Sequence, residues 1–187
     1  MAEDVSQIAA RKPRADAERN RLRLLEVAKA AFAEKGAAAS LDEIARAAGV
    51  GAGTLYRHFP TRDALIAAVY QNESEQLAAA ATRFAETDEP VEALREWMRL
   101  FVDYMATKHG MLEILDSIVG GSSGLRAASG ARTKQAMGML VQRAVDAGAI
   151  RLAVDPLDLL RAVAGVPDAA AAKQLVDILI AGMRVGA

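Results

Sequence analysis

A capped helix, a glycine turn and a second short helix occupy residues 40–59, and this pattern limits the fold more than any other part of the chain. Ser40 is a favourable helix N-cap and Glu43 follows three residues later, as in a capping box. Gly49 stands where the chain must turn sharply, because glycine tolerates a positive φ angle. Leu55 falls where it can pack on the first helix. The pattern predicts a helix-turn-helix, in which the second helix presents small and polar side chains to the DNA major groove.

The segment GVGAGTLYRHFPTRDAL, preceded by SLDEIARAA, resembles the DNA-binding signature of the TetR family of transcriptional regulators. The diagnostic part runs from Thr54 to Phe59 and is followed by Arg62. The resemblance covers residues 19–70, and beyond residue 70 it rests on length and helical character. It implies a homodimer whose helical body encloses a small-molecule pocket. It also implies that ligand binding releases a palindromic DNA operator.

The resemblance implies contacts to DNA phosphates from Ser40, Tyr56, His58 and Arg62, where the family more often has lysine at the last position. The other side chains of the second helix are candidates to approach or read bases: Ala52, Gly53, Thr54 and Arg57. Alternative interpretations remain for several of them. Ser40 would cap a helix in any protein, Tyr56 could pack edge-on against the helix expected at 16–35, and Arg62 could be an ordinary solvated charge.

The composition favours closely packed helices. Hydrophobic residues make up 52% of the 187 residues, much of this is alanine, and aromatic residues make up only 4%. No segment shows a convincing period of two, so we expect an all-α chain of about nine helices. We expect a three-helix DNA-binding head with an N-terminal arm in residues 1–62, and an effector-binding and dimerisation domain in residues 63–187.

Helical periodicity and capping residues indicate where the helices lie. They are expected at about 16–35, 41–48, 52–58, 62–86, 90–107, 112–118, 125 or 130–147, 156–164 and 168–184. Pro60 ends the third helix and Thr61 can cap the fourth. GGSSG at 120–124 is expected to be a flexible loop.

The charge distribution has the sign that DNA binding needs. The net charge is −1, yet residues 11–70 hold eleven basic against seven acidic residues. Residues 1–15 carry Arg11, Lys12 and Arg14 and are expected to form a mobile basic arm. That arm could equally be a solvated tail without DNA contacts.

Apolar positions in the second half suggest a ligand pocket and a dimer interface. The pocket candidates combine aromatic rings with thioethers, although such residues also build ordinary cores: Trp97, Phe101, Tyr104, Met105, Met111 and Met137. The interface candidates form two apolar helix faces, which could instead be intramolecular core: Leu140, Val141, Ala144, Leu175, Ile178 and Leu179.

Little in the sequence supports catalysis. There is no cysteine, only two histidines, and no metalloprotease, nucleophile-elbow or phosphate-loop pattern. We therefore expect no catalytic residue, no metal site and no cofactor. No apolar run of about 18 residues exists, so we expect a cytoplasmic protein without a membrane partner. The alternatives to a ligand-released repressor are an activator of the same fold and a helical ligand-binding protein without repressor activity.

Overall fold

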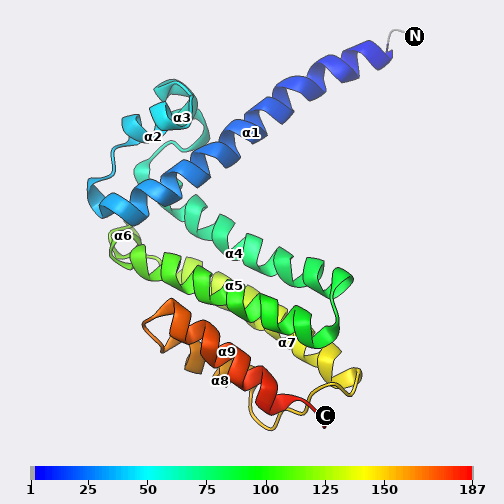
Figure 1. The fold of residues 1–187 in the computed structure, drawn as a ribbon. Helices are drawn as coiled ribbons and strands as arrows, with labels where there is room; N and C mark the ends of the chain where they lie inside the picture. The colour runs from blue at the N-terminus through cyan, green and yellow to red at the C-terminus, as the bar shows by residue number, and fades with distance from the viewer. Residues whose placement is uncertain (1–2, 187) are drawn as a thin grey trace. The chain divides into compact units, whose positions relative to one another are not determined.

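The computed structural model describes the backbone of residues 3–186 and the side chains of residues 15–186, and within these limits the chain is all helical (Figure 1). Nine α-helices and one short 3₁₀ turn follow one another in this described part. They are α1 (Glu3–Lys35), η1 (Gly36–Ala38), α2 (Leu41–Ala47), α3 (Ala52–His58), α4 (Arg62–Thr87), α5 (Pro90–Gly110), α6 (Leu112–Asp116), α7 (Ser123–Asp146), α8 (Pro156–Ala164) and α9 (Ala169–Met183). The all-α prediction is confirmed.

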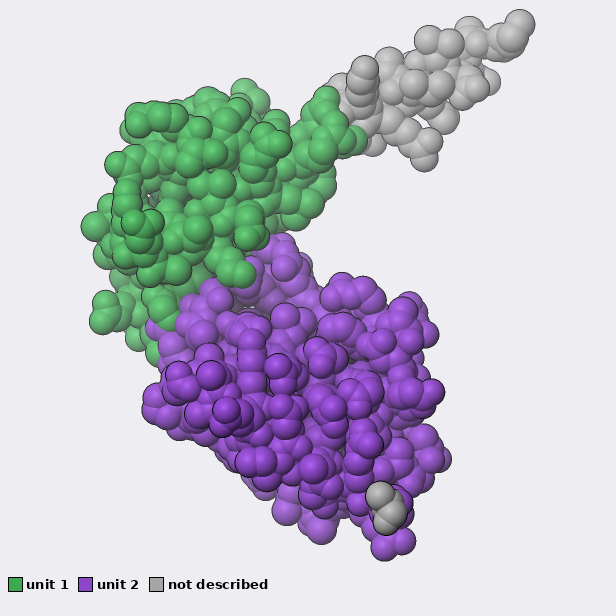
Figure 2. All heavy atoms as spheres, in the orientation of Figure 1, with its two compact units in different colours: residues 1–69, 110–121 green, residues 70–109, 122–187 purple. Residues whose placement is uncertain are grey.

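The chain forms two compact units, which Figure 2 colours separately. Unit 1 extends to Val69 and also contains Gly110–Gly121, while unit 2 holds Tyr70–His109 and the chain from Ser122 onward. The division falls inside α4, seven residues beyond the expected boundary at 62/63. The early part of α4 belongs with the head because Leu65 and Ile66 are fully buried there.

The core of unit 1 is the apolar stripe of α1 with the buried faces of α2 and α3. Leu24, Leu25 and Phe32 on α1 are buried, as the periodicity of this segment predicts. Ile44 on α2 and Leu55 on α3 are buried as well, and α1 contacts both short helices. Two helices of seven residues are too short to be stable alone, so their helical form depends on this packing.

Gly49 makes the turn between α2 and α3. Its φ angle is +68°, in the left-handed region that favours glycine. The turn is closed by backbone bonds, with Gly49 N donating to Arg46 O at 3.0 Å and Val50 N to Ala45 O at 3.0 Å. The predicted glycine turn is thereby confirmed.

Unit 2 is a helical body around a single apolar cluster built by α4, α5, α7, α8 and α9. Trp97 lies at its centre, fully buried, and its indole Nε1 donates to Leu77 O at 2.8 Å. This bond satisfies the one polar atom of the side chain, as burial of an indole requires. Trp97 and Phe101 stack with their ring centroids 6.1 Å apart.

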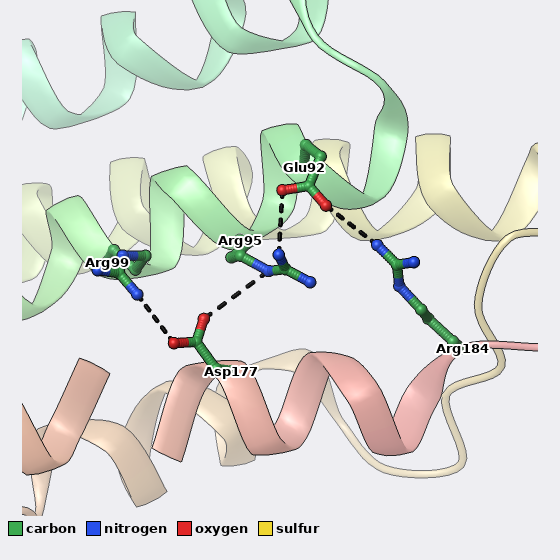
Figure 3. A network of polar contacts seen from close by, with 5 residues as sticks. All are labelled: Glu92, Arg95, Arg99, Asp177 and Arg184. Atoms are coloured by element: carbon green, nitrogen blue, oxygen red, sulfur yellow. Dashed lines mark hydrogen bonds and ion pairs between the residues drawn. The ribbon is translucent and has the colours of Figure 1, made fainter. Parts of the chain in front are cut away.

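A network of ion pairs joins α5 to α9 (Figure 3). Asp177 of α9 lies between Arg99, at 2.9 Å, and Arg95, at 3.8 Å. Glu92 pairs with Arg95 at 3.2 Å and with Arg184, directly after α9, at 3.0 Å. Single exposed pairs contribute little stability. The five charged side chains of this network are nevertheless linked to one another, so together they constrain the rotation of α9 relative to α5.

Several helix boundaries are confirmed, and each has a visible cap. Thr61 Oγ1 accepts from Ala64 N at 3.0 Å at the start of α4, as expected. Asp155 Oδ1 accepts from Leu157 N at 2.8 Å before α8, which covers the predicted residues. Asp168 Oδ1 accepts from Ala171 N at 2.8 Å before α9.

Two expectations about the connections are wrong. The first helix begins at Glu3 and not near residue 16, so the described backbone of the expected arm, from Glu3 onward, is helical. The side chains of its basic residues lie outside the described part. Within the expected loop Gly120 and Gly121 adopt positive φ angles, but the helix α7 already begins at Ser123. The loop expected at 120–124 is correspondingly shorter.

Among the helices of the described part, none combines the length and apolar character that crossing a bilayer requires.

Replacement of Gly49 by alanine is predicted to lower the free energy of unfolding by about 1–2 kcal/mol, because an L side chain disfavours the left-handed region. The nearest atom to an added Cβ is Arg23 Nη1 at 3.8 Å, so the cost is backbone strain and not a clash. Gly53→Ala is the matched control: it lies in α3 with open space around it, and it should be neutral or stabilising by up to about 1 kcal/mol. Urea denaturation followed by circular dichroism measures both. Equal effects at the two glycines would contradict the prediction.

Candidate nucleic-acid interface

Ser40 begins the helix-turn-helix as the N-cap of α2. Its Oγ accepts a hydrogen bond from Glu43 N at 3.4 Å, as the capping pattern predicts. The Glu43 carboxylate accepts instead from Lys35 Nζ, at 2.8 Å, on the last turn of α1. This bond lowers the pKa of Glu43 and raises the pKa of Lys35. The pair therefore ties α2 to α1, which the capping pattern did not indicate.

The exposed face of α3 is the surface that the helix-turn-helix offers to a partner. Ala52, Gly53, Tyr56 and Arg57 are exposed, and 47% of Tyr56 is accessible. Gly53, Tyr56 and Arg57 follow Ala52 by one, four and five residues, which places all four residues on one side of the helix. Leu55 is fully buried on the opposite side and holds α3 in the head.

Thr54 and His58 lie one turn apart at the edge of this face, and both are half-buried. The imidazole of His58 lies 6.1 Å from the ring of Phe59. In the described part of the chain, the side chains of Thr54, Tyr56 and Arg57 make no hydrogen bond to protein. Their donors and acceptors are consequently available to an external partner.

The side chain of Arg62 makes its contacts within the protein, whereas the sequence suggested a contact with a DNA phosphate. Its Nη1 donates to Ala39 O at 2.6 Å, and its Nη2 donates to Ala37 O at 2.8 Å and to Gly36 O at 3.3 Å. The guanidinium also lies over the ring of Phe32, 5.3 Å from its centroid. The side chain that was expected to reach a phosphate is thus occupied by backbone carbonyls inside unit 1.

Two arginines of α1 lie beside the motif, and sequence reasoning did not single them out. Arg21 lies over the ring of Phe59, 5.8 Å from its centroid. Arg23 is exposed, with its Nη1 near Gly49 at the turn before α3. Both arginines lie outside the sequence signature of the helix-turn-helix. Only the packing of α1 against α3 shows that they lie beside it.

The six pocket candidates of the body do not share one cavity. Trp97 and Met137 are fully buried, Phe101 and Tyr104 are buried, and Met111 belongs to unit 1. The Tyr104 hydroxyl is 2.6 Å from Ser129 Oγ, and burial raises its pKa above the ordinary value. These side chains are packed core in the described structure.

A cavity of about 500 Å³ lies elsewhere in unit 2, between α5 and the connection from α8 to α9. Of the six candidates only Met105 lines it. Most of the side chains that line it are apolar, among them Val102, Met105, Ala106, Val163, Val166 and Ala169, and His109 lines it as well. His109 is its one ionisable side chain.

The dimer-interface candidates separate into two groups. Leu140, Val141 and Ala144 on α7 are buried within the protomer, so as core residues they are not available to a second copy. On α9, Leu175 and Leu179 are half-buried and Ile178 is 67% exposed. The apolar face of α7 turns inward because α8 packs against this helix.

The described residues contain no group of three histidine, aspartate or glutamate side chains that could hold a metal ion.

Two family models match the chain. One, described as bacterial regulatory proteins of the tetR family, matches residues 24–69. The other, described as the C-terminal domain of SbtR-like transcriptional regulators, matches residues 89–185. Together they cover the helix-turn-helix and most of the body.

Solved structures and a sequence relative agree with these matches. A TetR transcriptional regulator from Streptomyces coelicolor is 38% identical with a TM-score of 0.80, over 89% of this chain and 99% of that chain. A TetR regulatory protein from Mycobacterium vanbaalenii is 36% identical with a TM-score of 0.76, over 92% of this chain and 99% of that one. An HTH-type transcriptional regulator from Staphylococcus aureus is 34% identical over 115 residues, so this chain spans 60% of that relative's length.

Proposed function

Because this chain belongs to the TetR family of DNA-binding transcriptional regulators, we propose that it is a repressor that a small-molecule ligand releases from a palindromic operator. The family consists of regulators and not of enzymes. The observation that carries the proposal is the exposed face of α3, with its unengaged polar side chains. As a regulator of chromosomal genes, the protein would act in the cytoplasm.

Ser40, Tyr56 and His58 are the proposed phosphate contacts. Ser40 carries its hydroxyl at the entrance to α2, Tyr56 presents a phenol on the exposed face, and His58 lies at the edge of that face. Such contacts fix the register of a protein on the duplex and carry no base information. The salt dependence of binding comes instead from cationic side chains, which neutralise phosphates and release counterions.

Thr54 and Arg57 are the proposed base readers of α3. A threonine hydroxyl bonds to a base edge and its methyl group packs on thymine, whereas arginine binds guanine through two donors. Ala52 and Gly53 have little to offer a base except close approach. Because the reading face is sparse, we propose that DNA shape contributes to specificity at positions that the protein does not touch.

The exposed side of α9 is the proposed homodimer interface. Five exposed residues of α9 share one face of the helix: Ala171, Gln174, Ile178, Ala181 and Gly182. The last four follow Ala171 by three, seven, ten and eleven residues, which is helical spacing. Small residues around Ile178 permit close approach of a second helix. The ion pairs of Asp177 with Arg95 and Arg99 favour this face being turned outward. Leu175 and Leu179 border it, while the α7 candidates play no part.

The cavity between α5 and the α8–α9 connection is the proposed effector site. Its volume lies within the range of about 300–1,000 Å³ that small-molecule sites occupy. Apolar walls and a single imidazole suit a small, mainly apolar molecule with one acceptor or anionic group, directed toward His109. Its proximity to α9 supports a link between ligand and dimer geometry.

An activator of the same fold, or a ligand-binding protein without repressor activity, is the alternative. Fluorescence anisotropy across a salt series separates the ligand-binding protein without repressor activity from a regulator that reads DNA. Selective binding with a steep salt dependence supports a DNA reader. Weak binding that is equal on all duplexes would favour the ligand-binding protein. Transcription assays with the bound promoter then distinguish repression from activation.

Thr54→Ala is predicted to alter sequence selectivity while leaving affinity for random duplex DNA unchanged. At the base pair that Thr54 reads, discrimination should fall by about 0.5–1.5 kcal/mol, the size of a single hydrogen bond. Anisotropy titrations on duplexes that differ at single base pairs measure it. Equal weakening on selected and random DNA would show that Thr54 contacts only the backbone.

Ala106→Trp is predicted to fill the cavity and to weaken binding of the aromatic sulfonate 1-anilinonaphthalene-8-sulfonate by about tenfold, a loss of about 1.4 kcal/mol. This probe combines apolar rings with one anionic group. Ala127→Trp on the exposed side of α7 is the control, because Ala127 does not line the cavity. Identical fluorescence titrations of the two variants would exclude the cavity as the site.

Ile178→Lys is predicted to shift the protein from dimer toward monomer, because it places a charge in the centre of the proposed interface. Val119→Lys is the matched control, because Val119 is 88% exposed and belongs to unit 1, not to the proposed interface on α9. Sedimentation equilibrium measures both variants. Retention of the dimer by Ile178→Lys would place the interface on another face.

A further inference from the structure

Arg62 connects the start of α4 to the segment between α1 and α2. Its guanidinium reaches back 23 to 26 residues, to the carbonyl oxygens of Gly36, Ala37 and Ala39. These carbonyls belong to the 3₁₀ turn and to the residue just before the N-cap of α2. One side chain thereby binds most of the backbone that leads into the helix-turn-helix.

This backbone segment needs a donor from outside itself. Carbonyls beyond the end of a helix have no partner in the helical ladder and must be satisfied by other groups. Gly36 has a φ angle of +55°, so α1 ends there abruptly, and its carbonyl accepts from Ala39 N at 3.3 Å. The Ala37 and Ala39 carbonyls receive their bonds from Arg62.

The geometry suits arginine better than lysine. A planar guanidinium offers a rigid fork of donors, whereas a lysine ammonium is a single point with freely rotating donors. The bonds from Nη1 and Nη2 diverge to three acceptors, and the face of the guanidinium is covered by the fully buried ring of Phe32 at 5.3 Å. These bonds engage both Nη atoms, so a phosphate could use only the donors that remain, Nε–H and the second Nη1–H.

We propose that Arg62 is a positioning residue for DNA binding and not a phosphate contact: it holds the α1–α2 connection, and through it Ser40 and α2, in the geometry that docks α3. This inference rests on the proposed DNA-binding function. A positioning arginine and a phosphate-binding arginine differ in the salt dependence of DNA binding. A positioning residue changes the affinity without contributing to counterion release.

The test compares Arg62→Ala, Arg62→Lys and the wild-type chain on a duplex that the wild type enriches from a random-sequence library. Anisotropy titrations across a salt series, well below the unfolding midpoint of each variant, give the affinity and the slope of log affinity against log salt. Hydrogen exchange reports on residues 36–40. Arg83→Ala, which removes an exposed charge of α4 in unit 2, is the charge-matched control. If the wild type enriches no duplex, the DNA-binding proposal itself fails.

The expected result is a loss of affinity of about tenfold in Arg62→Ala, with an unchanged salt slope and faster exchange at residues 36–40. Arg62→Lys should remain within about threefold of Arg62→Ala, because a lysine lacks the fork. Should Arg62→Ala fail to fold, the lysine variant decides by its affinity and by the exchange at residues 36–40, since lysine keeps the charge on which the slope depends. Arg83→Ala should match the wild type.

Two results would overturn the proposal. A slope that falls by about one, together with rescue by lysine, identifies a phosphate contact. A lower unfolding temperature with full affinity and an unchanged slope identifies a purely structural role without influence on docking.

Discussion

Burial of the apolar stripe of α1 against α2 and α3 is the contact on which the DNA-facing surface depends. Each of the two short helices has seven residues, below the length at which an isolated helix is stable in water. They are helical because they pack on α1: Ile44 and Leu55 are buried, as are Leu24, Leu25 and Phe32 of α1. With its apolar side fixed in this way, α3 can leave its other side to small and polar residues, which contribute almost nothing to the stability of the head.

Backbone polar groups at the helix junctions set the orientation of these elements. The left-handed turn at Gly49 sets the path from α2 to α3, and the Lys35–Glu43 pair ties the first turn of α2 to the end of α1. Arg62 satisfies the carbonyls between these helices from the start of α4. The helix-turn-helix is therefore held by polar contacts at its ends as well as by its small core.

In the body, an apolar cluster supplies cohesion while charges determine orientation. Trp97 and its neighbours bury the inner faces of α5, α7, α8 and α9. The ion pairs of Asp177 and Glu92 lie along α5 and α9 and constrain the rotation of α9 (Figure 3). The outward position of Ile178 is a consequence of both. Hydrophobic burial alone is non-directional and would not select that rotation.

The sequence by itself determined the helical class, the helix-turn-helix, the turn at Gly49 and the start of α8 at Pro156. These depend on local signals: periodicity, caps, and the backbone freedom of glycine or restriction of proline. Only the tertiary structure decided which apolar faces are buried, so Leu140, Val141 and Ala144 became core, and a cavity opened beside Met105 but not around Trp97. It likewise directed Arg62 to carbonyls 23 to 26 residues away. Such partners are distant in sequence, and no local pattern encodes them.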